Sequence, residues 1–205
     1  MLISLGATIP TRAAELDPRA LVRGLERPIP ASIAFQEIRF SALLEHPLVV
    51  SGELRYVAAD HLERLVTDPY KERTTVRGES VRVERHREKL RTFALHRAPE
   101  LKGILMAFSG LLAGKLDAVQ QHFEVSAEGT QDTWSMRLTP RDARVQKQLT
   151  ELRMIGHDDQ PACFFMTSSG GAQSVMLFGA LANEPIDAAA TVESLTGLCT
   201  AETSR

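Results

Sequence analysis

The chain has 205 residues, of which 43% are hydrophobic and 24% charged, values typical of a folded globular protein. Its 24 basic and 26 acidic residues give a formal net charge of −2, which excludes binding of nucleic acid or an anionic membrane by overall charge alone. No apolar run approaches the roughly 18 residues that a membrane-spanning helix needs. We therefore expect one folded domain over residues 15–199.

The first residues are similar to the second half of a secretory signal sequence. Leu2–Ile9 is mostly apolar, and Thr11-Arg12-Ala13 places small residues at positions −3 and −1 of a cleavage site after Ala13. The basic segment that precedes such an apolar run is missing, so we expect the gene to start further upstream. Residues 1–14 are accordingly predicted to be the remnant of a signal peptide, and a disordered N-terminal tail is the alternative.

A short helix and two long strands are predicted next. Asp17–Arg27 has apolar residues at helical spacing, Asp17 can cap the helix and Pro18 suits its first turn. Over residues 34–44 the even positions are mostly apolar, and the odd positions from 37 to 41 are Glu, Arg and Ser, which indicates a half-buried strand. Leu48–Tyr56 shows the same alternation.

The alternation also assigns the faces of these strands. In the first strand, Ile38 and Phe40 lie on the apolar face, which we expect to point inward. Glu37 and Arg39 lie on the other face, which we expect to point to solvent.

Short strands dominate the following segment. One is predicted at Leu62–Val66, and a ladder of strands from Lys71 to Leu95 turns at residues 77–79 and 86–89. Arginine and glutamate side chains interleave along this ladder, which favours a solvated face with cross-strand ion pairs. A docking surface for an acidic partner is the alternative interpretation.

The clearest helix spans Ala98–Ala113. Apolar residues recur along it at spacings of three and four, which is typical of a buried helical stripe. The opposite side is also apolar, with Met106 and Ala107, so we expect the helix to be buried or to cover an apolar surface. A shorter helix is predicted at Leu116–Gln121.

Strands return after these helices. We predict them at Phe123–Ala127, Trp134–Leu138, Leu149–Ile155, Ala162–Thr167 and Gln173–Gly179. A final helix is predicted within Pro185–Leu198, capped by Asp187, and residues 200–205 are predicted to form a flexible tail. Runs of short strands with tight turns indicate an antiparallel sheet or an open barrel.

The sequence carries no recognisable catalytic or metal-binding motif. Gly110–Lys115 departs from the phosphate-binding loop in its glycine spacing and lacks the following Ser or Thr, and the six histidines show no metal-binding spacing. The predicted inner faces also carry almost no titratable groups, whereas catalysis needs several to converge in a pocket. We therefore predict that the protein is not an enzyme and uses no cofactor and no metal.

The inner faces instead carry large apolar side chains, several of them methionines. Methionine is flexible and suits surfaces that accept varied apolar ligands, although an ordinary packed core is the alternative. The predicted ligand contacts, in the cavity and on the helix that covers it, are Ile38, Phe40, Leu54, Tyr56, Leu101, Ile104, Leu105, Phe108, Leu112, Trp134, Met136, Leu138, Met154, Phe164, Met166, Met176 and Phe178.

The two cysteines, Cys163 and Cys199, are compatible with one disulfide formed in an oxidising compartment. Their separation is not that of a C-x-x-C motif, which argues against redox chemistry and zinc binding. Two buried free thiols are the alternative.

The order of several short motifs resembles that of the periplasmic outer-membrane lipoprotein carriers, the LolA-like family. In the first half these motifs are Phe35-Gln36-Glu37, the strand 47–56, Leu62-Glu63-Arg64 and Asp68-Pro69. In the second half they are the helix end 111–114, His122-Phe123, the strand 134–140 and the strand 174–178. The resemblance covers roughly residues 31–178.

The resemblance implies an α+β fold, in which an incomplete antiparallel β-barrel, or strongly curved sheet, and a helical lid enclose a hydrophobic cavity. It further implies a periplasmic, monomeric carrier that binds the acyl chains of a lipoprotein and has no nucleic-acid partner. Such a carrier takes its cargo from an inner-membrane extractor and delivers it to an outer-membrane acceptor.

Two departures from the family pattern are the segment His61–Arg64, where archetypal carriers have aromatic residues, and the cysteine-bearing tail. They leave another lipid-like hydrophobe as an equal alternative cargo. A lipid-sensing regulatory module and a non-hydrolytic enzyme on the same fold are the alternative functions.

Overall fold

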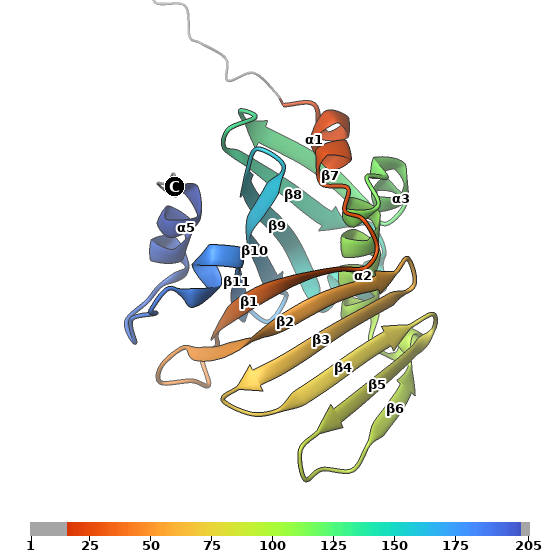
Figure 1. Ribbon diagram of the computed structural model, residues 1–205, viewed down its shortest axis with the longest axis vertical. Coiled ribbons are helices and arrows are strands. Elements are labelled where there is room, and N and C mark those ends of the chain that lie inside the picture. The colour runs from red at the N-terminus through yellow and green to blue at the C-terminus, as the bar shows by residue number, and fades with distance from the viewer. Residues whose placement is uncertain (1–15, 202–205) are drawn as a thin grey trace, which may run out of the picture.

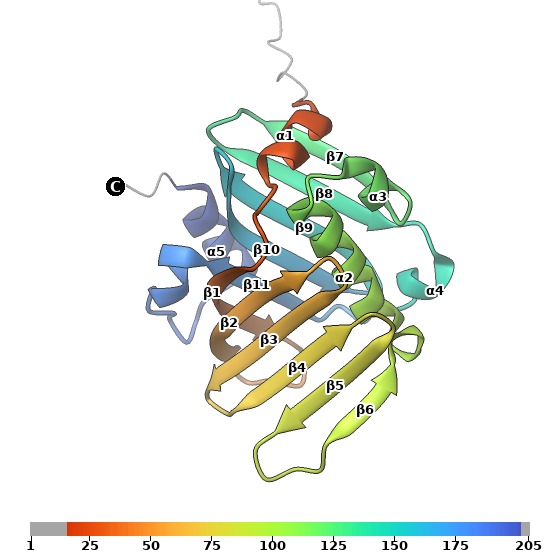
Figure 2. The ribbon, with the colours of Figure 1, turned by 45° about the vertical axis from the view of Figure 1, so that its right-hand side comes forward.

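A computed structural model describes residues 16–201, and the predicted signal-peptide remnant therefore lies outside the described residues (Figure 1). Across this range, eleven strands form one antiparallel sheet in the order β6-β5-β4-β3-β2-β1-β11-β10-β9-β8-β7. β6 and β7 stand at opposite ends of that order, so the curved sheet does not close into a barrel (Figure 2). The predicted α+β class and the open, strongly curved sheet are confirmed.

Each half of the sheet is a meander of strands that are consecutive in the chain. The first half comprises β1 (Ala31–Phe40), β2 (Leu48–Ala58), β3 (His61–Asp68), β4 (Glu72–Arg77), β5 (Ser80–Arg85) and β6 (Arg91–Ala94). The second half comprises β7 (Phe123–Gly129), β8 (Trp134–Pro140), β9 (Leu149–His157), β10 (Gln160–Ser168) and β11 (Gln173–Phe178). The halves meet where β1 pairs with β11.

The helices lie at the sheet's two faces. They are α1 (Pro18–Gly24), η1 (Leu95–Arg97), α2 (Pro99–Leu112), α3 (Leu116–Gln120), α4 (Ala143–Gln146), η2 (Gly179–Asn183) and α5 (Val192–Thr200). α2 runs between the two halves of the sheet, and α5 lies on the opposite side of β9–β11 (Figures 1 and 2). We call the face that carries α2 the inner face and the face that carries α5 the outer face.

The last helix begins later than the sequence predicts. The carboxylate of Asp187 accepts a hydrogen bond from the backbone N–H of Ala189 at 2.7 Å, which stabilises a turn instead of a helix. The helix starts at Val192, where Thr191 and Ser194 cap each other's backbone N–H groups. Thr200 still belongs to α5, so the predicted flexible tail does not begin there, and residues 202–205 lie outside the described range.

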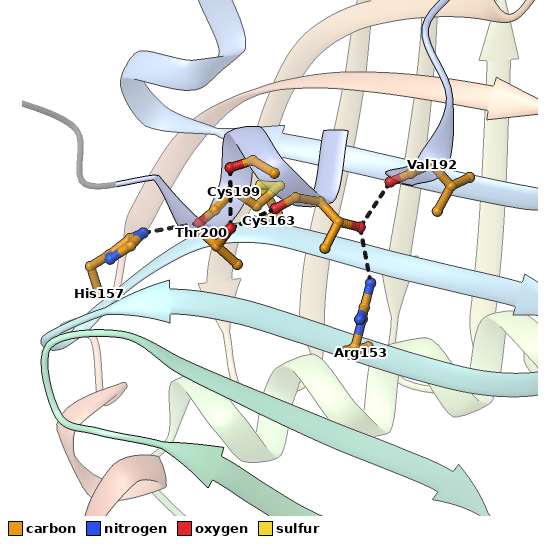
Figure 3. Close-up of a disulfide and its surroundings, with 8 residues drawn as sticks. Arg153, His157, Cys163, Val192, Cys199 and Thr200 are labelled. Carbon is orange, nitrogen blue, oxygen red and sulfur yellow. Dashed lines mark hydrogen bonds between the residues drawn. A yellow bond between two sulfur atoms is a disulfide. The ribbon is translucent and has the colours of Figure 1, made fainter. Parts of the chain in front are cut away.

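A disulfide holds α5 against the outer face. It joins Cys163 of β10 to Cys199 of α5, with the two Cα atoms 5.9 Å apart (Figure 3). The ring of His157 lies beside it, with Nε2 2.9 Å from the carbonyl oxygen of Cys199. The guanidinium of Arg153 donates a hydrogen bond to the Thr196 hydroxyl at 3.2 Å. α5 is thereby fixed to β9 and β10 by covalent and polar contacts.

We predict that this cross-link contributes substantially to stability. Replacing both Cys163 and Cys199 with alanine should lower the free energy of unfolding by roughly 3–4 kcal/mol in the chain-entropy model, because the bond closes a loop between residues 36 positions apart. Urea unfolding of the oxidised protein and of the double variant measures this difference. Thiol titration of the denatured, unreduced protein should find no free thiol, and two titratable thiols would contradict the prediction.

Candidate functional site

A cavity of about 500 Å³ lies on the inner face, between α2 and strands from both halves of the sheet. A volume of this size is typical of a ligand pocket, whereas ordinary packing defects are not much larger than one water molecule. Its apolar wall is lined by Ile33, Leu54, Tyr56, Leu62, Val76, Val81, Val83, Phe93, Leu101, Ile104, Leu105, Phe108, Leu112, Met154, Phe164, Met166, Met176 and Phe178.

α2 forms the cavity's helical wall because its two sides are in contact with different elements. Ala107 is buried in the core that α2 shares with the second half of the sheet, and Leu111 is buried at the boundary between this core and the cavity. Gly110 lets α2 approach α3 closely, since a Cβ there would lie 2.5 Å from Cγ2 of Val119. The remaining side of α2, including Ile104 and Phe108, faces the cavity. The predicted stripe is therefore divided between core and cavity.

The cavity wall is an apolar environment for the groups that line it. The rings of Phe108 and Phe164 are in direct contact within this wall, with centroids 4.6 Å apart and planes tilted by 49°. Burial raises the pKa of the Tyr56 hydroxyl above its ordinary value, because the ionised form is poorly solvated there. The wall therefore offers contact surface to an apolar ligand and little solvation to a charge.

Most of the predicted ligand contacts are brought together in this wall. Those that line the cavity are Leu54, Tyr56, Leu101, Ile104, Leu105, Phe108, Leu112, Met154, Phe164, Met166, Met176 and Phe178. Val81, Val83 and Phe93 also line the cavity and are not among the predicted contacts, although their alternation places them on one face of the ladder. That period-two signal could have identified them.

Two predicted contacts lie on the opposite face of the sheet. Ile38 is fully buried on the outer face, in the cluster that contains the disulfide, and Phe40 packs against the same cluster. The reason is that β1 lies at the centre of the sheet, where η2 and α5 cover its outer face. The apolar side chains at the even positions of β1 pack against these two helices. The side chains at its odd positions, such as Glu37 and Arg39, face the cavity instead.

Three further predicted contacts lie in packed core. Trp134, Met136 and Leu138 of β8 are almost completely buried against the helices of the inner face, and none of them lines the cavity. The indole Nε1–H of Trp134 donates a hydrogen bond to the carbonyl oxygen of Asp158 at 2.8 Å. These side chains are on the predicted face of the sheet, but helices fill the space opposite them.

The expectation that the inner faces lack titratable groups is wrong. Glu37, Arg39 and Arg64 all line the cavity. Glu37 is only 5% exposed, and its Oε2 accepts hydrogen bonds from Nη2 of Arg39 at 2.8 Å and from Nη2 of Arg64 at 2.5 Å. The sequence offered no sign of this contact, because Arg64 lies 27 residues from Glu37.

The surroundings of Glu37 keep it ionised. Burial by itself raises the pKa of its carboxyl group, but the hydrogen bond from Arg39 and the charges of Arg64 and Arg39 lower it by more. The net result is a pKa below the ordinary value. The cavity thus combines an apolar wall with one buried, charged end.

Within residues 16–201, no group of three His, Cys, Asp or Glu side chains is arranged to hold a metal ion. The same range contains no helix that is both long and apolar enough to cross a membrane.

Comparison with known proteins gives one match across nearly the whole chain. A family model described as "Outer membrane lipoprotein carrier protein LolA-like" matches residues 10–202. No curated protein was found to match.

Several solved structures show a distant likeness. LolA superfamily protein NE2245 from Nitrosomonas europaea matches with a TM-score of 0.44 and 10% identity, over 82% of this chain and 92% of that one. A putative outer membrane lipoprotein-sorting protein domain from Vibrio parahaemolyticus matches with a TM-score of 0.42 and 8% identity, over 89% and 97%. Lipoprotein LppX from Mycobacterium tuberculosis matches with a TM-score of 0.41 and 12% identity, over 84% and 100%.

The buried carboxylate predicts a pH dependence of stability. Because the pKa of Glu37 is lower in the folded than in the unfolded protein, its contribution is fully present above the unfolded value of about 4.3 and is lost as the pH falls through the folded value. Glu37→Gln should lower the free energy of unfolding by about 1–3 kcal/mol at pH 7. The same substitution should also make the free energy of unfolding fall less steeply as the pH drops below 5.

Urea unfolding at a series of pH values measures both effects. Glu53→Gln is the matched control, because Glu53 forms a similar pair with Arg55 but is more exposed. Its removal should change stability little. Parallel pH profiles for the wild type and Glu37→Gln would contradict the prediction.

Proposed function

This chain belongs to the LolA-like family of outer membrane lipoprotein carrier proteins, and we propose that it is a periplasmic carrier of acyl chains. In this proposal the cavity binds the acyl chains of a lipoprotein or another lipid-like cargo. The protein takes the cargo from an extractor in the inner membrane and delivers it, as a monomer, to an acceptor in the outer membrane.

The observation that carries the proposal is the apolar cavity of about 500 Å³ between α2 and the sheet. Each methylene moved from water into such a site contributes about 0.8 kcal/mol, so one long chain gains several kcal/mol from burial alone. Binding and release by partition require no bond to be made or broken, which is why we assign no catalytic residue.

Release requires either an acceptor that binds the cargo more tightly or a separation of the two walls of the cavity. α2 is packed closely on α3 through Gly110, so that side is unsuited to opening. The other side of α2 contacts β4–β6 through Leu101 and Leu105, which pack with Val81 and Phe93. We place the opening between α2 and these strands.

A charge at Phe108 tests whether the cavity takes up acyl chains. Phe108 is partly buried and meets Phe164 in the cavity wall. In Phe108→Asp, an entering chain would have to desolvate a carboxylate, so uptake of a fluorescent fatty acid should be lost while folding persists. Phe40→Asp places the same charge on the outer face and should leave uptake unchanged.

Thermal melting and probe titration of both variants decide the outcome. If Phe108→Asp loses several kcal/mol of stability and the wild type takes up no probe, the region is a packed core and the carrier proposal fails.

The proposed location is tested by fractionating cells that express the chain from its natural gene, including the sequence upstream. We expect the protein in the periplasmic fraction, with Cys163 and Cys199 oxidised, because that compartment favours disulfides. We also expect its N-terminus to follow Ala13. Retention in the cytoplasm with both thiols free would contradict the proposal.

A further inference from the structure

One end of the cavity is built from a chain of alternating charges. Glu37 accepts hydrogen bonds from Arg39 on its own strand and from Arg64 on β3. Arg64 also lies 3.7 Å from Glu72 of β4, which in turn pairs with Arg85 of β5 at 2.7 Å. Arg85 also pairs with Glu88 at 3.3 Å, so this chain of three arginines and three glutamates is neutral as a whole. The excess positive charge belongs to the cavity lining, where Arg27, Arg39 and Arg64 stand against Glu37 and Glu63 and leave a net charge of +1.

Gly52 makes room for the ring that supports Arg64. β2 lies between the strands that carry Glu37 and Arg64, and Gly52 lets the ring of Phe35 and the backbone of Leu65 lie close to β2. A Cβ at Gly52 would come 3.1 Å from the ring of Phe35 and 1.8 Å from the carbonyl oxygen of Leu65. Arg64 stacks on that ring, with Cζ 4.9 Å from its centroid. The guanidinium is thereby fixed in the cavity wall.

Ser174 adds a buried hydroxyl to the same end. It is 7% exposed, it lines the cavity, and it pairs with Arg39 across the junction of β11 and β1. Its side chain forms no hydrogen bond with any other residue in the range 16–201, and Arg39 donates to Glu37 alone within that range. The Arg39 side chain is 38% exposed. Donor capacity therefore remains at both residues.

We propose that this end of the cavity, formed by Glu37, Arg39, Arg64 and Ser174, binds a single anionic head group of the cargo lipid, a carboxylate or a phosphate. The inference rests on the proposed carrier function and specifies the cargo. One anion matches the excess positive charge, and the spare N–H and O–H groups are the donors that such an anion needs. A neutral head group would leave the excess charge uncompensated, and a cationic one would be repelled.

Probes that share one chain and differ only in the head group test the inference. Hexadecanoate, hexadecyl phosphate, hexadecanol and hexadecyltrimethylammonium each compete with a neutral fluorescent probe for the oxidised full chain. At least one anion should bind roughly ten- to hundredfold more tightly than hexadecanol, the effect of one charge-assisted hydrogen bond. The order of the two anions distinguishes a carboxylate from a phosphate.

Two substitutions should move this preference in opposite directions. Arg39→Gln should bring the affinity for the anions down to that for hexadecanol and leave hexadecanol binding unchanged. Glu37→Gln should increase the affinity for the anions, because both arginines lose the carboxylate that they share. Arg55→Gln is the matched control, since Arg55 forms the same kind of pair with Glu53 away from the cavity. Ser174→Ala replaces Arg39→Gln if that variant does not fold, and should also weaken anion binding.

The outcomes separate this inference from the proposed function. If the wild type binds all four probes equally, or binds the cation best, the head-group inference is overturned and the carrier proposal stands. The same holds if Arg39→Gln, or Ser174→Ala in its place, keeps the full preference for anions. If the wild type binds none of the probes, the carrier proposal itself is overturned.

Discussion

The pairing of β1 with β11 is the contact on which the cavity depends. It joins the two meanders into one sheet, and its register places Glu37 opposite Met176 and Arg39 opposite Ser174 on the inner face. A shift of one residue in this register would turn every side chain of β1 to the other face. Glu37 and Arg39 would then point toward the outer face, away from Arg64, and Ile38 would point into the cavity. The geometry of the site is therefore set by one pairing between segments far apart in the chain.

The strands and helices themselves were largely predictable because their signals are local. The helical stripe predicted over residues 98–113 corresponds to α2 at Pro99–Leu112, and the alternating segments correspond to strands. The faces of β1 were not predictable in the same way. The rule that polar residues face water failed at Glu37, because its partner Arg64 comes from a strand two positions away in the sheet. A rule based on one strand cannot include such a partner.

The sequence also could not predict which inward-facing side chains line the cavity and which are packed in the core. Met136 and Met154 are paired in neighbouring strands and are both almost fully buried, yet only Met154 lines the cavity. Alternation places both side chains on the inner face and says nothing about what lies opposite. The positions of α1, α2 and α3 decide which part of that face is filled, and those positions depend on close contacts such as that of Gly110 with Val119.

A cavity of this size lowers the stability of the fold, and other parts of the structure must compensate for that loss. The side chains that line an unfilled space lack the packing contacts that they would have in a filled core, and the loss of these contacts lowers the stability of the fold. The packed core around Trp134 shares Met154 and Phe164 with the cavity wall, whereas the outer-face cluster that contains the Cys163–Cys199 disulfide lies apart from it and stabilises the sheet independently of the cavity. In the proposed carrier function, an acyl chain that fills the space would restore the missing contacts, so the stability lost to the cavity would return as affinity for cargo.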